Sequence, residues 1–384
     1  MKMAKFTFAL ALTVFIGSFT AQGQQTVNQI PLRDDLVIMF GSAPGAPDLP
    51  EMFSRNSESR YAWDRSRSLI DEIQFAFYHL YPSPDREMLK HIQGNTFPVL
   101  VENGAFHAVS KKYGMKTAIQ VAAIKEHSCF RDRQQYENNI EMTSEAAIRF
   151  VKNSAVLNRF DIDTAMGHKV CSHSRTREAE LVARWSMDLE TTYYRKIAEM
   201  ARTRPGLSVP PVSFCDIEPY PYIPIDEHIL YIARVHQQRI LHGYAGFECY
   251  DLDIDVTLAE KTGADLVNDF ARLVAFARPL GIKVGVIING DDSRSWITDN
   301  DHWYFQTTNY RLIRFKELGL FDMADRVAIM SWAKRSPPPG EKFGPADMPR
   351  NLPETDANTH TNYVLHVLDC IRGVHACSVY PHPR

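Results

Sequence analysis

The stretch V-S-F-C-D-I-E-P-Y-P-Y at residues 212–222, with F-E-C-Y-D-L-D-I-D-V-T at residues 247–257, carries the clearest fold signal in the chain. Each stretch begins with apolar residues, as a buried strand does, and ends in carboxylates two residues apart. Side chains two apart on a strand share a face, so Asp216 and Glu218 should project together, as should the aspartates of the second stretch. A parallel β-barrel tolerates clustered carboxylates at its mouth, where active sites are built.

Strand-like and helix-like stretches alternate outward from these two segments. Apolar runs ended by turn residues predict eight strands, at residues 36–41, 72–77, 116–122, 212–218, 246–253, 283–289, 326–332 and 376–380. Amphipathic spacing between most of them predicts helices, and this alternation implies a parallel sheet. Eight such units predict an α/β fold, a (β/α)8 barrel of TIM type, with an open doubly wound sheet as the alternative.

One range interrupts this alternation of predicted strands and helices. Residues 125–174 are rich in His, Arg, Asp and Asn, with a helical piece near residues 144–153. We therefore expect a long insertion after the third strand, lying outside the helix ring over the barrel mouth. Residues 24–384 would then form a single barrel domain that carries this insertion.

The start of the chain resembles a targeting segment. A charged M-K-M-A-K is followed by an apolar run at residues 6–19 and by Ala21-Gln22-Gly23. This is the pattern of a signal peptide, here residues 1–23, cleaved after Gly23. The apolar run is short for a membrane span, although an uncleaved anchor is the alternative. We expect a secreted or periplasmic protein without stable membrane association after cleavage.

The net charge limits the classes of binding partner to expect, and the cysteine content bears on the cellular compartment. The net charge of −3 argues against nucleic acid as a partner. Six cysteines could form disulfides in an oxidising compartment. Cys129 with Cys171 is the first candidate pair and residues 370 and 377 form the second, whereas Cys215 and Cys249 read as small buried residues.

Acids and aromatic rings follow the predicted strands and form the candidate site. Rings stack on the C–H faces of sugars, and a pair of carboxylates can cleave a glycosidic bond. The candidate catalytic residues are Glu218, Asp253, Asp251 and Asp216. The candidate substrate-binding residues are His79, Tyr81, Tyr220, Asn289, Asp291, Trp296 and Trp332.

Within this set Glu218 is the candidate general acid. Its partly apolar surroundings and the like charge of Asp216 both raise the pKa of a carboxyl group. Asp253 or Asp251 would supply the second carboxylate. Two aspartates also have structural interpretations, since Asp255 could cap a helix and Asp291 could serve a turn.

Two short motifs resemble known enzymes. D-I-E-P at residues 216–219 resembles the acid-bearing fourth strand of (β/α)8 glycoside hydrolases, in which Asn-Glu-Pro is common; only Glu-Pro matches. D-L-D-I-D at residues 251–255 resembles the D-x-D-x-E strand of chitinase-like barrels, with Asp255 or Thr257 at the glutamate position. Residues 329–332 hold no acid where the first group places a nucleophilic glutamate. The resemblance implies a barrel that hydrolyses glycosides.

The leading hypothesis is therefore an exported glycoside hydrolase that acts on a poly- or oligosaccharide without a cofactor or metal. One alternative is a metal-dependent barrel of the sugar-isomerase or phosphoesterase kind, with an oxygen-rich site. The other is a non-catalytic glycan-binding barrel.

Overall fold

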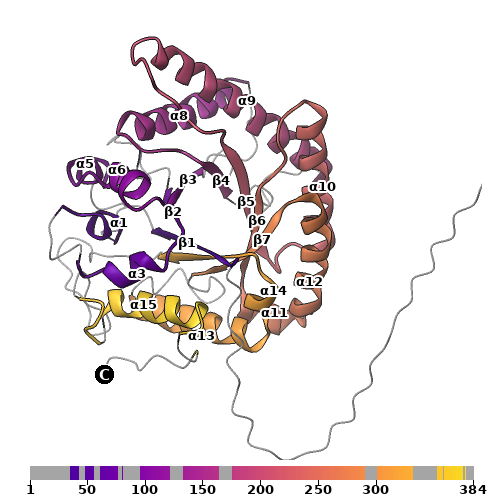
Figure 1. The fold of residues 1–384 in the computed structure, drawn as a ribbon. Coiled ribbons are helices and arrows are strands. Elements are labelled where there is room, and N and C mark those ends of the chain that lie inside the picture. The colour runs from indigo at the N-terminus through magenta and orange to yellow at the C-terminus, as the bar shows by residue number, and fades with distance from the viewer. Residues whose placement is uncertain are drawn as a thin grey trace, which may run out of the picture. The chain divides into compact units, whose positions relative to one another are not determined.

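The structure, a computed structural model, describes residues 35–42, 48–55, 61–76, 80, 96–121, 133–163, 175–289, 301–331, 353–357, 359–374 and 377. Within these residues eight parallel strands close into a barrel in sequence order (Figure 1). The strands are β1 (Val37–Ser42), β2 (Glu72–Ala76), β3 (Lys116–Val121), β4 (Arg159–Asp163), β5 (Ser213–Tyr220), β6 (Cys249–Ile254), β7 (Lys283–Ile288) and β8 (Arg326–Ser331). The predicted (β/α)8 barrel of TIM type is confirmed.

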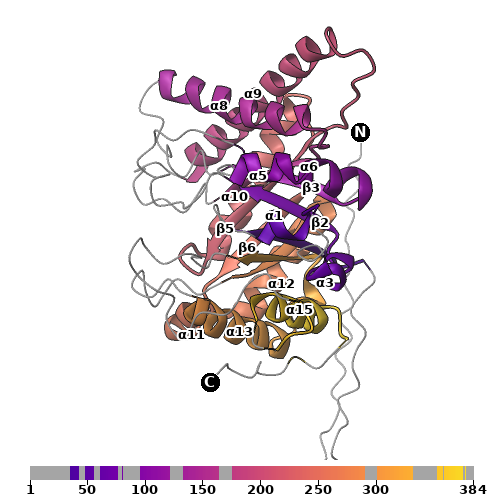
Figure 2. The ribbon, with the colours of Figure 1, turned by 90° about the vertical axis from the view of Figure 1, so that its left-hand side faces the viewer.

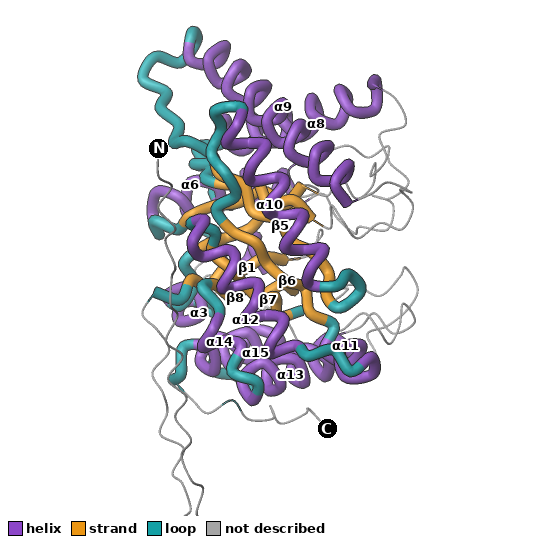
Figure 3. The backbone as a smooth tube through the Cα atoms, turned by 90° about the vertical axis from the view of Figure 1, so that its right-hand side faces the viewer, coloured by secondary structure: helices purple, strands orange, loops and turns teal. Residues whose placement is uncertain are grey.

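Helices surround this barrel (Figures 1 and 2). Their bounds are α1 (Asp48–Met52), α3 (Asp64–Ser68), α5 (Thr96–Glu102), α6 (Ala105–His107), the π-helix η2 (Ala108–Lys112), α8 (Arg133–Lys152), α9 (Arg175–Ala201), α10 (Ile225–Leu241), α11 (Val256–Thr262), α12 (Leu266–Ala277), the 3-10 helix η3 (Arg278–Leu280), α13 (Asp301–Glu317), α14 (Leu320–Met323) and α15 (His360–Ile371). Figure 3 shows α10 and α12 outside β5 and β6. The core fills the space between strands and helices, as where Phe75 meets Phe106 and Phe150 at about 5 Å between ring centres.

The range predicted as an insertion contains a barrel strand. Residues 133–163 form α8 and then β4, and β4 pairs with β3 on one side and β5 on the other. The strand predicted as fourth, at residues 212–218, is therefore the fifth. The sequence of β4, R-F-D-I-D, looked polar because its charged residues point into the barrel interior and not into solvent. Residues 125–132 and 164–174 lie outside the described residues.

The barrel closes without the last predicted strand. β8 pairs with β1 from Val37–Arg326 to Ser42–Ser331. The strand predicted at residues 376–380 lies, except for Cys377, outside the described residues, as do the predicted signal peptide and the pair Cys129–Cys171. No helix in the described part of the chain has both the length and the apolar character needed to cross a membrane.

Local signals set several helix ends. Asp255 caps α11, since its Oδ1 accepts a hydrogen bond from the Leu258 amide at 2.8 Å, as its position before an apolar run suggested. Gly263 ends the same helix with a φ of 69°, a value that favours glycine. The second disulfide candidate is confirmed, because Cys370 and Cys377 are bonded with Cα atoms 4.9 Å apart.

Candidate functional site

Side chains alternate between the two faces of β5, and this alternation determines which way Asp216 and Glu218 point. Ile217 packs against side chains of β1, β7 and β8, none of which neighbours β5, so it reaches them across the barrel interior. Asp216 and Glu218 lie on the opposite face, toward the surrounding helices. The Tyr231 hydroxyl of α10 donates to Asp216 Oδ2 at 2.5 Å, which agrees with this direction.

A buried polar cluster fills this outer side of the strand. Asp216, Glu218, His228, Tyr231 and Tyr250 are each inaccessible to solvent. Burial raises the pKa of Asp216 to about 7, against the lowering effect of hydrogen bonds from Tyr231, a backbone amide and Glu218. His228 Nδ1 and the Tyr250 hydroxyl lie 2.7 Å apart. The two carboxyl groups are both shielded from solvent, which suits them to hold a proton and not to meet a substrate.

The four predicted carboxylates do not share one cleft. Asp216 and Glu218 do project together, as expected, and the two are also hydrogen-bonded to each other. They face α10, however, whereas Asp251 pairs with Arg326 inside the barrel, and Asp253, two residues along β6, shares that inward face. The prediction of a common cleft is therefore wrong, and the geometry gives no support to Glu218 as a general acid at the mouth.

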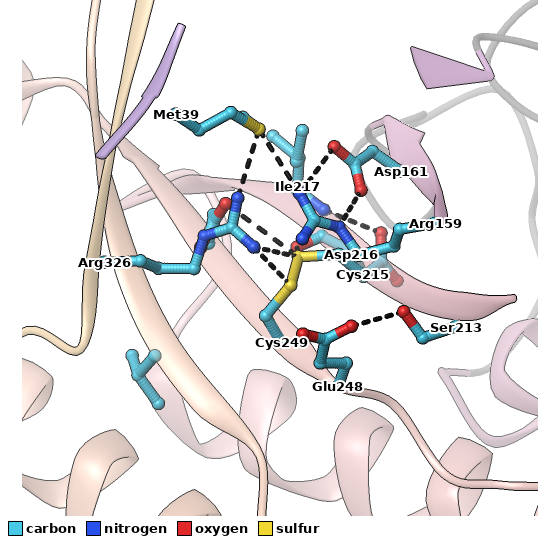
Figure 4. The surroundings of a disulfide bond; sticks show 12 residues. Met39, Arg159, Asp161, Ser213, Cys215, Asp216, Ile217, Glu248, Cys249 and Arg326 are labelled. Atoms are coloured by element: carbon cyan, nitrogen blue, oxygen red, sulfur yellow. Dashed lines mark hydrogen bonds and ion pairs between the residues drawn. A yellow bond between two sulfur atoms is a disulfide. The ribbon is translucent and has the colours of Figure 1, made fainter. Parts of the chain in front are cut away.

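A charged network fills the amino-terminal half of the barrel interior (Figure 4). Glu72 Oε2 lies 2.8 Å from an Arg159 nitrogen and 3.3 Å from an Arg326 nitrogen. Arg159 also pairs with Asp161 at 2.5 Å, and Arg326 pairs with Asp251 at 3.2 Å. Burial alone would raise the pKa of Glu72, but Arg326 and Arg159 outweigh it and lower the pKa to about 2. For Asp251 burial outweighs Arg326, and the pKa rises to about 6.

A disulfide lies inside the same network. Cys215 and Cys249 are register partners on β5 and β6, with Cα atoms 4.5 Å apart, and are bonded rather than merely buried (Figure 4). Gly285 on β7 makes room for the ion pair beside it, because an added Cβ would lie 2.1 Å from Asp251 Oδ1. Features at this end of a barrel contribute stability. We therefore assign Asp251 to a structural network and not to the mouth.

Asp253 lies two residues closer to the carboxyl end of β6, and a quarter of its side chain is exposed. The buried Arg311 of α13 pairs with its Oδ1 at 2.7 Å. Asn289, just after β7, donates to its Oδ2 at 3.2 Å, and Arg311 donates to the Asn289 side-chain oxygen. These contacts close a triangle that fixes the Asp253 carboxylate at the mouth.

A second carboxylate ends β4. Asp163 follows Arg159 and Asp161 at a spacing of two, so it shares their inward face, and it is only partly buried. One strand, β5, separates it from the strand of Asp253. Backbones two strands apart lie about 9–10 Å from each other, and inward-pointing side chains come closer. Asp163 and Asp253 are thus the inward-facing carboxylates at the carboxyl ends of β4 and β6.

The remaining predicted residues have three outcomes. Tyr220 faces the helices, is buried, and donates its hydroxyl to Asp269 of α12 at 2.6 Å, so it does not line the mouth. The predicted substrate-binding residues outside the described part of the chain are His79, Tyr81, Asp291, Trp296 and Trp332. Asn289 is the predicted binding residue that the structure brings to Asp253.

Two residues of the mouth were missed from the sequence. Asp163 lay in the presumed insertion, although Phe160 and Ile162 alternate with the charged residues at the strand period. Arg311 lies in the middle of a helix and reaches the site only through the tertiary fold, so no local pattern identifies it. Within the described residues no group of three or more His, Cys, Asp or Glu side chains could hold a metal ion.

Comparisons with known proteins found solved structures of low sequence identity and no family. No protein-family model matches the sequence, and no curated protein matches it either. Similar solved structures include a Bacteroidetes-affiliated GH5 cellulase, with 9% identity, a TM-score of 0.43 and coverage of 88% of this chain and 91% of that one. A GH10 structure from Paenibacillus barcinonensis has 11% identity, a TM-score of 0.41 and coverage of 79% and 86%. The HMG-CoA lyase of Bacillus subtilis has 12% identity, a TM-score of 0.39 and coverage of 92% of this chain and 97% of that one.

Proposed function

We propose that the protein is an exported glycoside hydrolase that acts on a poly- or oligosaccharide at the carboxyl end of its barrel. The observation that carries the proposal is the carboxylate pair of Asp163 and Asp253, which point inward from β4 and β6 where barrel active sites are built. Glycosidic cleavage requires two carboxyl groups, separated by about 5–5.5 Å for retention and by 6.5–9.5 Å for inversion. Two inward side chains with one strand between them fit that range.

The contacts of Asp253 suggest its role in the reaction, and the remaining role is then assigned to Asp163. Asp253 is ion-paired with Arg311 and held by Asn289, which suits a carboxylate that attacks the sugar or activates a water molecule. The reaction also needs a proton donor, and we assign that role to Asp163, the other inward-facing carboxyl group. Protonation of the leaving oxygen by Asp163 would then accompany attack from the side of Asp253.

Export is the second part of the proposal. The signal-peptide pattern of residues 1–23 supports it. The two disulfides, Cys215–Cys249 and Cys370–Cys377, also support it, because such bonds persist in oxidising compartments. Expression of the full chain with detection of the shortened protein outside the cytoplasm tests this part, and retention of an unprocessed chain would contradict it.

The catalytic part is tested with a panel of poly- and oligosaccharides. Wild-type protein should release reducing ends from at least one of them, and Asp163→Asn and Asp253→Asn should each reduce turnover by about 10²–10⁴-fold. Glu218→Gln is the matched control. It makes the same acid-to-amide change at a buried position on the helix-facing side of β5, away from the mouth, and should leave turnover intact. Melting temperatures confirm that each variant is folded.

The control variant also decides whether Asp163 or Glu218 is the proton donor. Loss of turnover in folded Glu218→Gln, with activity kept in Asp163→Asn, would return the acid role to Glu218. Full activity in both mouth variants would refute the carboxylate pair. A wild-type protein that binds a glycan without cleaving it would be a binding barrel instead.

A further inference from the structure

We infer that Gln74 and Gln120 form a subsite on the interior wall of the barrel that binds one uncharged hydroxyl group of the substrate, an inference that rests on the proposed function. Both side chains face the interior. Gln74 lies two residues after Glu72 of the charged network, and its Nε2 donates to Asp161 Oδ2 at 2.6 Å. Gln120 of β3 is the register partner of Asp161 and so shares its inward face. The exposed fractions are 1% for Gln74 and 5% for Gln120.

The two amides carry hydrogen-bonding groups that the described residues do not satisfy. A carboxylate can only accept, so the Asp161 contact directs the nitrogen of the Gln74 amide toward β4 and leaves its oxygen as an acceptor. That oxygen is buried and has no hydrogen-bond partner within the described residues. Nor does any described residue form a hydrogen bond with the Gln120 amide. Buried polar groups are nearly always hydrogen-bonded, so a ligand that supplies the missing partners accounts for both residues.

A purely structural interior does not need amides at these positions. On β5, β7 and β8 the interior is filled by apolar side chains, those of Ile217, Ile287 and Met330. Replacing an unpaired buried amide by an apolar group of similar shape is neutral or stabilising. The two amides therefore do not serve the stability of the free protein, which is typical of residues kept for a functional site.

The subsite lies beneath the proposed proton donor. Asp163 follows Asp161, the register partner of Gln120, by two residues, a rise of about 6.6 Å along the strand. The Gln120 side chain and a substituent that projects from a sugar ring can together span this distance. A sugar unit held at Asp163 can thus direct one substituent toward the amides.

The chemistry of the wall identifies that substituent. A hydroxyl group can donate to the Gln74 oxygen and accept from the Gln120 amide nitrogen. The carboxylates of Asp161 and Asp163 on the same wall disfavour an anionic substituent such as a uronate. Among the hydroxyl-bearing groups of a pyranose, the hydroxymethyl group reaches farthest from the ring. The ligand class is therefore a neutral hexose, in preference to a pentose.

The test compares two sugars that differ only in this group. Xylose lacks the hydroxymethyl group of glucose, so cleavage of glucose and xylose oligosaccharides of the same linkage is measured as kcat/KM. Wild type should prefer the hexose by roughly 10- to 100-fold, because a site built to hydrogen-bond a hydroxyl rejects an analogue without it. Gln120→Met and Gln74→Met remove the amide and should slow hexose cleavage by a similar factor, with pentose cleavage nearly unchanged. The matched control is Gln237→Met, at an exposed position on α10, which should keep wild-type selectivity.

Melting temperatures separate this role from a structural one. Gln120→Met breaks no hydrogen bond within the described residues, so its melting temperature should equal or exceed that of wild type. A lower melting temperature with unchanged selectivity would show that Gln120 serves packing and would overturn the subsite.

The remaining outcomes distinguish this inference from the proposed function. Equal cleavage of both sugars by wild type, or a hexose preference that survives in folded Gln120→Met, would overturn the subsite while leaving hydrolysis in place. A protein that cleaves neither sugar but binds the hexose selectively in calorimetry, with selectivity lost in Gln120→Met, would support the subsite and overturn hydrolysis. A protein that neither cleaves nor binds either sugar would overturn both.

Discussion

The buried carboxyl pair on the outer face of β5 should make the protein less stable as the pH rises through neutrality. Burial raises the folded-state pKa of Asp216 from 3.8 to about 7. Between these values the folded state binds more protons than the unfolded state, so the free energy of unfolding falls as the pH increases. A difference of about three pKa units corresponds to at most about 4 kcal/mol, which is lost between about pH 4 and pH 7.

The substitution Asp216→Asn removes the titrating group and keeps an oxygen that can accept from the Tyr231 hydroxyl. We expect the variant to match wild type near pH 4 and to exceed it by a margin that grows up to about pH 7, reaching at most about 4 kcal/mol at pH 8. The assay is urea unfolding at pH 5, 6, 7 and 8, analysed by the midpoint and slope of each transition. Tyr231→Phe is the control, because it removes the hydroxyl donor but leaves both carboxyl groups, and it should retain the pH dependence. Parallel stability profiles for wild type and Asp216→Asn would refute the reasoning.

Two further predictions concern the interior network. Glu72→Gln should destabilise the protein by about 3–5 kcal/mol, because it leaves two buried guanidinium groups without their shared carboxylate, and the loss is measured by urea unfolding at pH 7. An effect below about 1 kcal/mol would show that the network contributes little. Gly285→Ala should lower stability by about 1–3 kcal/mol or more, because the new methyl group would lie 2.1 Å from Asp251 Oδ1; thermal unfolding tests this, and an unchanged midpoint would contradict the close contact.

The sequence predicted the barrel because the strand and helix periods are visible locally. All strands except β4 were predicted within a few residues of their observed positions. β4 was missed because its charged residues enter a charged interior, so it lacks the apolar run that marks its neighbours. A rule that expects apolar side chains inside a barrel cannot recognise such a strand.

The sequence also could not show which face of β5 points into the barrel, and the reason is different. Cys215, Asp216, Ile217 and Glu218 are all buried, so neither face of the strand shows a solvent-side pattern that would orient it. The period of two correctly paired Asp216 with Glu218, but it could not say whether the pair faces the interior or the helices. Two contacts made in the folded structure resolve this: Ile217 packs across the barrel interior, and Asp216 bonds to Tyr231, 15 residues away on another element.

The layered interior determines where the sequence of this protein can change in evolution. The charged network around Glu72, the apolar layer containing Ile217 and the mouth around Asp253 occupy successive levels of the same barrel. A substitution at the mouth leaves the ion pairs of the first level intact, so the sequence there can vary without an obligatory loss of folding. The converse does not hold, since each charge of the first level constrains its partners. Divergence among descendants of this chain should therefore concentrate at the carboxyl end of the barrel, and a library for altered specificity should be built there.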